Sequence, residues 1–190
     1  MKCSEEMYAD TIYLHPAELC VCDEPTKVIT VLGSCVSVTL FSRKLSIGAI
    51  CHGAMPQCRK RRGCHEVCEE AFKYVDCSLH YMLAKFRGYG VADSDIEVKL
   101  FGGADTLSSK KENTIGSMNV KMALEIIRQE HLRIIAADVG DSFGRKIIFL
   151  THTGDVFLKR LKDAGAVGQT TGVTFKTRGN EGEDQSPYYR

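Results

Sequence analysis

The sequence predicts one mixed α/β domain, a single-domain layered sandwich in which two main helices cover a mixed β-sheet. Short β-type runs fill residues 11–56, two later stretches have helical spacing, and further apolar strands separate and follow these helices. The chain has 190 residues, enough for one domain with a proper core. We expect this domain to occupy residues 1–164. Residues 165–190 are rich in Gly, Thr, Gln and charge, and are expected to form a flexible C-terminal tail.

Five strands are expected before the first helix. Three are short β-rich runs between proline-containing breaks, at residues 11–14, 18–22 and 27–32. The next run, residues 35–41, alternates, with Val36, Val38 and Leu40 on one face. Residues 45–52 follow after a polar break. These last two runs are predicted to form a β-hairpin.

Helices and strands then take turns along the rest of the chain. Apolar residues recur at helical spacing over residues 67–86 and again over residues 117–131. Further strands are expected at residues 96–103, at 132–140 and, as a pair around Thr153-Gly154-Asp155, at 145–161.

The composition is that of an ordinary globular protein, with 44% apolar and 26% charged residues. A formal net charge of +1 gives no global field that would recruit nucleic acid or a membrane surface. No apolar run approaches the ~18 residues of a membrane span, so no membrane insertion is expected. The start of the chain is acidic and polar, unlike a secretory signal, and we expect a cytoplasmic protein.

The nine cysteines do not indicate a disulfide scaffold, because their number is odd and no export signal precedes them. A metal site is the alternative interpretation of one group. Cys58, Cys64 and Cys68 cluster with His65, but the chain has no Cys-x-x-Cys pair of the kind that zinc sites usually contain. We therefore expect neither a metal nor an organic cofactor.

One cysteine stands directly after Gly33-Ser34, and a histidine follows it seventeen positions later. If the hairpin turns about Arg43-Lys44, Cys35 lies directly opposite His52 on the same face, with Cβ atoms roughly 4.5–5.5 Å apart. A slip of one residue would place the two side chains on opposite faces. The spacing therefore predicts a contact between a thiol and an imidazole.

Such a contact combines a nucleophile with an acid–base partner. A free cysteine is only a few per cent thiolate at pH 7, and a neighbouring imidazole lowers the thiol pKa to ~3.5–7.5. Gly33 allows a sharp bend before Cys35, which leaves the backbone N–H groups of Ser34 and Cys35 free to hold an oxyanion. The alternative is that Cys35 and His52 are packing residues.

The order of motifs along residues 12–161 carries a family resemblance. These motifs are "TVLGSCVSVTLF", "GAICHGAMP", "YVDCSLHYMLAKF", "VKLFGGAD", "IGSMNV" and "IIAADVGDSFGRKIIFLTHTGDVFLKRL". Together they resemble the chemoreceptor glutamine deamidase family, CheD. The resemblance implies a protein-glutamine glutaminase that converts glutamines of chemotaxis receptors to glutamate with release of ammonia, on a fold similar to the catalytic domain of deamidating toxins.

The resemblance also implies roles for residues and partners. It places the nucleophile at Cys35 and its histidine at His52, and Thr30 is the expected orienting residue, with a plain strand threonine as the alternative. The substrates would be the cytoplasmic helices of chemoreceptors, and a CheC-type phosphatase is a regulatory partner of some members. The basic loop Arg59–Arg62 would either steer acidic receptor helices or be a solvated loop.

Two other functions remain open from the sequence. The chain could be a non-catalytic binding partner that regulates a chemotaxis phosphatase, although intact Cys35 and His52 argue against it. It could also be a metal or redox sensor that uses the cysteines around residues 58–68.

Overall fold

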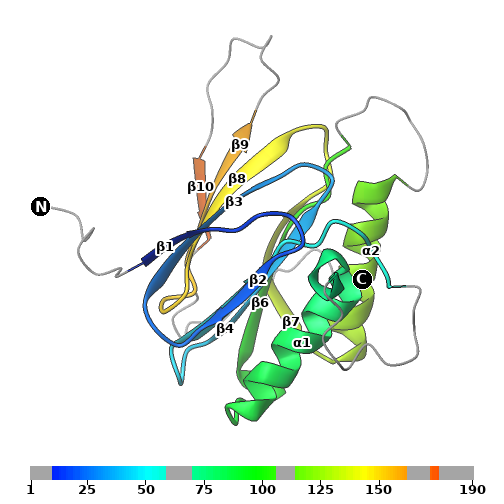
Figure 1. Cartoon of the computed structure of the whole chain (residues 1–190). Helices are drawn as coiled ribbons and strands as arrows, with labels where there is room; N and C mark the ends of the chain where they lie inside the picture. Colours follow the sequence, from blue (N-terminus) through cyan, green and yellow to red (C-terminus); the bar gives the residue numbers. More distant parts are fainter. Residues whose placement is uncertain (1–9, 59–69, 106–113, 162–171, 176–190) are drawn as a thin grey trace, which may run out of the picture.

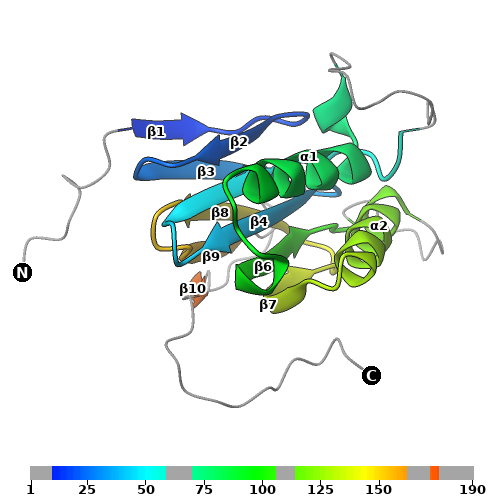
Figure 2. The same ribbon diagram turned by 90° about the horizontal axis from the view of Figure 1, so that it is seen from below.

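The computed structural model describes residues 10–58, 70–105, 114–161 and 172–175. These residues form two five-stranded sheets and two α-helices, arranged in three layers (Figure 1). The predicted α/β sandwich is confirmed, with the strands divided between two sheets. The outer layers are the helices and sheet A, and sheet B lies between them (Figure 2).

Sheet A combines strands from both ends of the chain. In spatial order its strands are β1 (Asp10–Tyr13), β3 (Thr26–Leu32), β8 (Gly144–Leu150), β9 (Val156–Leu161) and β10 (Gly172–Phe175). Strand β1 is parallel to β3, and the other neighbours are antiparallel.

Sheet B supplies the central layer. In spatial order its strands are β2 (Leu19–Cys22), β5 (Ile47–Cys51), β4 (Val36–Ser42), β6 (Ile96–Gly102) and β7 (Arg133–Val139). Every residue of β4 is buried, because this strand is covered by the helices on one face and by sheet A on the other. The predicted hairpin of residues 35–52 is the β4–β5 pair.

Two helices, α1 (Val75–Gly88) and α2 (Ile115–Gln129), pack side by side on the outer face of sheet B (Figures 1 and 2). Thr114 caps α2 by accepting a hydrogen bond from the backbone N–H of Ser117 at 3.2 Å. Short 3₁₀ turns precede α1 and β6: η2 (Ala71–Lys73) and η3 (Asp93–Asp95). Of the predicted first helix, residues 67–69 lie outside the described residues.

Two apolar cores separate the layers. The larger one joins the helices to sheet B through residues such as Val36, Leu79 and Ile127. The smaller one fills the space between the sheets and includes Val28 and Phe149. Alternation along the strands divides their side chains between these two cores.

Four residues of the predicted tail form β10, which pairs with β9. Phe175 packs against Phe101 of sheet B, with ring centroids 5.3 Å apart. No sequence signal indicated this strand, and the rest of residues 165–190 lies outside the described residues.

In the part of the chain that the structure describes, we find no helix with the length and apolar character needed to cross a bilayer.

Candidate active site

The candidate active site lies where β3 of sheet A passes into β4 of sheet B. Gly33 and Ser34 form the bend between these strands, and Cys35 is the last residue before β4. The Cys35 side chain packs against the inter-sheet core. His52 follows β5 directly and stands two positions after Ile50, which belongs to the same core. Both side chains therefore lie on the face of sheet B that looks toward sheet A, as the alternation predicts.

The register of the hairpin differs from the predicted one by two residues. Thr39 pairs with Ile50, and the turn consists of residues 43–46, so its centre lies one position beyond Arg43-Lys44. Ser46 closes this turn in the left-handed region, at φ 54°. The prediction was wrong because the residue types did not reveal which residues would form the turn.

The shift keeps both side chains on one face but makes them diagonal neighbours. Val36 and Gly53 exchange two backbone hydrogen bonds of 2.9 Å each. The residue opposite His52 is therefore Ser37, and Cys35 lies two positions further along the same face. Diagonal neighbours of this kind have Cα atoms roughly 7–8 Å apart and remain within reach of long or aromatic side chains.

Thr30 reaches His52 from the opposite sheet. Its Oγ1 lies 2.8 Å from Nδ1 of His52 and 2.7 Å from the carbonyl oxygen of Leu14. A hydroxyl has one proton and a carbonyl can only accept, so Thr30 donates to Leu14 and accepts from the Nδ1–H of His52. This arrangement holds the proton on Nδ1 and leaves Nε2 as the basic nitrogen. The contact fits the expected orienting role of Thr30, and it forms because Thr30 projects from sheet A.

The imidazole of His52 is poised to accept a proton. His52 is 2% exposed, and its Nε2 has no hydrogen-bond partner among the described residues. Burial lowers the pKa of His52, and the Leu14 carbonyl and the charge of Glu18 offset only part of this effect. The ring is therefore neutral at pH 7, the state in which it can act as a base.

Cys35 is half-buried, and burial raises the pKa of its thiol. The backbone N–H of the same residue opposes this effect without overcoming it. The resting pair is therefore a thiol and a neutral imidazole. The sequence predicted a thiolate as the major form, and this differs because removal from water disfavours the charged form of both groups.

The nucleophile loop, residues 33–35, has all three of its carbonyls tied to the protein. Their donors, in chain order, are Ala104 N–H at 2.8 Å, Asn119 Nδ2 at 3.0 Å and Gly103 N–H at 2.8 Å. The backbone N–H groups of Ser34 and Cys35 donate to no other residue in the described ranges. Two N–H groups beside a nucleophile, neither of them bonded to another residue, are the donors that an oxyanion needs.

The sequence drew attention to Gly33, but the glycines that this geometry requires are Gly102 and Gly103. A Cβ on Gly33 would meet nothing within 4 Å, and its φ is not in the left-handed region, so the bend does not need glycine. Gly102 and Gly103 do have positive φ, at 103° and 67°. A Cβ on Gly102 would overlap the carbonyl oxygen of Cys35. These two glycines allow the backbone at the end of β6 to pack directly against the backbone of the nucleophile loop.

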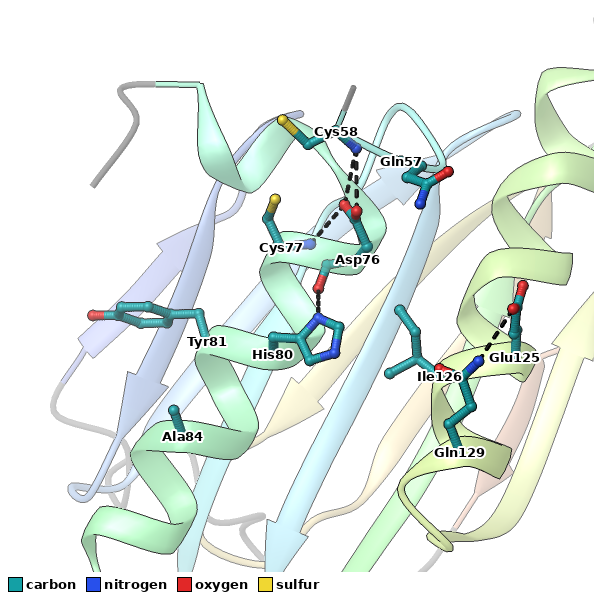
Figure 3. Close-up of a pocket in the computed structure, with 10 residues that line it drawn as sticks. All are labelled: Gln57, Cys58, Asp76, Cys77, His80, Tyr81, Ala84, Glu125, Ile126 and Gln129. Atoms are coloured by element: carbon teal, nitrogen blue, oxygen red, sulfur yellow. Dashed lines mark hydrogen bonds between the residues drawn. The ribbon is translucent and has the colours of Figure 1, made fainter. Parts of the chain in front are cut away.

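A separate hollow of about 480 Å³ lies between α1 and α2 (Figure 3). The helices cover one face of sheet B, and Cys35 and His52 lie on the other face. The polar groups of the hollow are largely engaged with one another. The carboxylate of Asp76 accepts from the backbone N–H groups of Cys58 and Cys77, and Nδ1 of His80 donates to the Asp76 carbonyl at 2.8 Å. Figure 3 shows no nucleophile facing a base among the ten residues drawn.

The described residues contain no group of three His, Cys, Asp or Glu side chains arranged to hold a metal. Of the cluster considered from the sequence, only Cys58 is described, and it lines this hollow. Cys64, His65 and Cys68 lie outside the described residues, as does the basic loop Arg59–Arg62.

Comparison with known proteins shows that this chain is similar to CheD proteins of bacteria and archaea. The family model for CheD, chemotactic sensory transduction, matches residues 56–160. That match begins just after the segment containing His52, so it does not include the two proposed reacting side chains.

Curated relatives align over more of the chain. A probable chemoreceptor glutamine deamidase CheD 2 from Geobacter sulfurreducens is 43% identical over 151 residues, which cover 79% of this chain and 89% of the relative. A probable chemoreceptor glutamine deamidase CheD from Maridesulfovibrio salexigens is 38% identical over 156 residues, covering 80% and 92%. One from Methanosarcina acetivorans, named CheD 1, is 36% identical over 138 residues, covering 72% and 84%.

Proposed function

The chain belongs to the CheD family, and we propose that it is a chemoreceptor glutamine deamidase in which Cys35 and His52 perform the reaction. The named relatives are called probable chemoreceptor glutamine deamidases. The observation that carries the mechanism is the hydrogen bond from His52 Nδ1 to Thr30, which leaves Nε2 as the basic nitrogen, without a partner among the described residues. The substrate is the side-chain amide of glutamines on chemoreceptor helices.

In the first half of the reaction, His52 Nε2 accepts the thiol proton as the Cys35 sulfur attacks the amide carbonyl. The N–H groups of Ser34 and Cys35 hold the negative oxygen of the tetrahedral intermediate. The imidazolium then gives its proton to the departing nitrogen, the C–N bond breaks, and ammonia leaves. A thioester joins the receptor side chain to Cys35.

Water completes the reaction. Neutral His52 takes a proton from water as its oxygen attacks the thioester carbonyl. The C–S bond breaks, and the sulfur recovers the proton from the imidazolium. The receptor then carries glutamate in place of glutamine. Each half of the reaction ends with His52 neutral again, in the tautomer that its hydrogen bond to Thr30 favours.

The substrate also suggests a place and a partner. Because the modified receptor helices are cytoplasmic, we assign the same location to this protein. A CheC-type phosphatase is the proposed regulatory partner, since this pairing occurs in the family that the chain resembles.

Mass spectrometry of a receptor cytoplasmic fragment tests the proposal. The wild-type protein should add the small mass gain of replacing an amide –NH₂ by –OH at specific glutamines, and Cys35→Ala should add none. Cys22→Ala, which removes a half-buried thiol from β2, is the matched control and should retain activity. Full activity in Cys35→Ala would refute the assignment of the nucleophile. Binding of the fragment by wild-type protein without any mass gain would favour the non-catalytic function.

A further inference from the structure

Asn119 of α2 contacts both segments that carry the proposed catalytic pair. Its Nδ2 lies 3.0 Å from the carbonyl oxygen of Ser34, in the nucleophile loop, and 3.2 Å from that of Ala54. Ala54 belongs to the histidine segment, residues 52–55. An amide nitrogen has two protons, so one side chain donates to both segments at once. The Asn119 side chain is fully buried.

The two contacts determine which way the amide points. In the reverse orientation Oδ1 would face two carbonyls, and none of the three oxygens has a proton to donate. With Nδ2 toward the carbonyls, Oδ1 is buried and has no hydrogen-bond partner among the described residues. Leaving a buried acceptor unpaired lowers stability. The unpaired oxygen is therefore a cost of having asparagine at this position, and the two donated hydrogen bonds are the reason for its presence.

Apart from Asn119, the donors to the backbone carbonyls of these two segments are backbone N–H groups. In the nucleophile loop the backbone donors are Ala104 and Gly103, and in the histidine segment they are Ala17, Val36 and Val75. Within the described ranges, Asn119 is the side chain that donates to the backbone of both segments. A substitution can remove this tie and leave the backbone network unchanged.

Gly116 explains how α2 comes close enough for this contact. A Cβ at Gly116 would lie 2.6 Å from the carbonyl oxygen of Gly103 and 2.8 Å from that of Ala104. Residues three apart share a face of a helix, so the turn that packs on this backbone also aims Asn119 at the site.

We infer that Asn119 is a positioning residue that sets the distance between Cys35 and His52 by joining their two segments through one amide. This inference rests on the proposed deamidase chemistry. Because the pair is diagonal, a small shift of either segment moves the sulfur away from Nε2. Misplacement by about 1 Å is enough to lower a rate by roughly a hundredfold.

Three variants test the inference. Asn119→Ala removes the amide, and Asn119→Leu keeps the branching of the side chain in a larger, good helix former that has no donor. Thr114→Ala is the control, because it removes the cap of α2 and destabilises the helix without touching either segment. Thermal unfolding of each variant reports the structural effect.

Kinetics on the receptor fragment should separate positioning from folding. Both Asn119 variants should lower kcat about ten- to a hundredfold with KM changed less than about twofold, since no receptor contact is removed. Thr114→Ala should keep kcat close to wild type despite a lower unfolding midpoint. A folded Asn119 variant with wild-type kcat, or an equal loss of kcat in Thr114→Ala, would overturn the inference.

Alkylation of the Cys35 peptide by iodoacetamide, followed by mass spectrometry, gives a readout that needs no receptor. Loss of His52 should slow the labelling, and loss of Asn119 should slow it for the same reason. In the His52→Ala background, Asn119→Ala should therefore have little further effect, whereas independent, additive losses would contradict a role through His52. If Cys35→Ala still deamidates the receptor, the proposed function fails; if only the Asn119 results are negative, the inference alone fails.

Discussion

The hydroxyl of Thr30 has one proton and two neighbours, the Leu14 carbonyl and the His52 ring. This local arrangement decides which imidazole nitrogen is basic. A side chain of the same shape without the hydroxyl leaves the ring free to rotate or to change tautomer. The strand itself should persist, because valine suits a strand as well as threonine does.

Thr30→Val should therefore lower kcat about 10- to 100-fold. It should also lower the free energy of unfolding by about 1–3 kcal/mol, because the buried Leu14 carbonyl and the Nδ1–H of His52 lose this partner. Thr39→Val is the control: Thr39 is also buried on the inter-sheet face of sheet B, but makes no contact with His52. Steady-state rates on the receptor fragment check this. Equal rates in both variants would mean that Thr30 is a plain strand threonine.

The pH dependence of kcat/KM should report His52 in the free protein. Burial lowers the pKa of His52, so the neutral base persists below the ordinary histidine value of about 6.5. Activity should accordingly be retained at pH 6.5 and fall only at lower pH, as His52 becomes protonated. An acidic limb centred above pH 6.5 would instead indicate a base stabilised in its charged form.

At the scale of elements, α2 is held against the site by a glycine contact. Alanine is intrinsically better than glycine in a helix by about 1 kcal/mol. At position 116 this advantage is opposed by a Cβ that would lie 2.6 Å from the Gly103 carbonyl oxygen. Close contact with rigid backbone cannot relax without moving the helix. The unfavourable contact should therefore outweigh the higher helix propensity of alanine.

Gly116→Ala should lower the free energy of unfolding by about 1–3 kcal/mol and reduce kcat, because α2 carries Asn119 away from both segments. Gly88→Ala, at the end of α1, is the matched control: its Cβ would meet nothing within 4 Å. That change should be neutral or stabilising by up to about 1 kcal/mol. Chemical denaturation of both variants measures the difference. A Gly116→Ala protein as stable as Gly88→Ala would show that the contact relaxes freely.

At the scale of the whole molecule, Lys99 joins the two sheets. It is 1% exposed, and its Nζ donates to the carbonyls of Gly154 at 2.6 Å and Phe175 at 3.1 Å. Lys99 belongs to sheet B, and both acceptors belong to the strands and turns of sheet A. Burial lowers its pKa to about 8, with the charges of Asp155 and Glu97 acting in the opposite direction.

This shift predicts a pH-dependent stability. Between pH 8 and about 10.4 the unfolded chain keeps the Lys99 proton and the folded one releases it, so this residue makes folding more favourable as pH rises. Across that window the free energy of unfolding of the wild type should rise by about 3 kcal/mol relative to that of Lys99→Met. The cysteines ionise in both proteins and cancel in the difference. If the free energies of unfolding of the wild type and of Lys99→Met changed with pH in parallel, the lowered pKa of Lys99 would be contradicted.

The strand order along the chain was largely readable from the sequence, because alternation and turn residues are local signals. Residues 27–32, for example, were expected and β3 spans Thr26–Leu32. Strand β10 was missed, since its four residues pack through the long-range contact of Phe175 with Phe101. The division into two sheets likewise depends on pairings between distant segments, such as β3 with β8.

The residues of the candidate site were proposed from the sequence, which gave their geometry only in part. The spacing placed Cys35 and His52 on one face, but the register was two residues off because turn length sets it. Thr30 was the expected orienting residue, but the sequence had no means of showing that it approaches His52 from another sheet. Asn119 lies 85 positions from Ser34, and no local pattern reveals that contact.

A receptor peptide with a diazoketone analogue in place of the substrate glutamine tests the central claim most directly, because its ketone carbonyl takes the place of the amide carbonyl and its alkylating diazo carbon takes the place of the amide nitrogen. Digestion and mass spectrometry then locate the adduct among the nine cysteines. Labelling of Cys35, strongly reduced in His52→Ala, is the predicted result. An adduct on a different cysteine, or equal labelling without His52, would contradict catalysis by this pair.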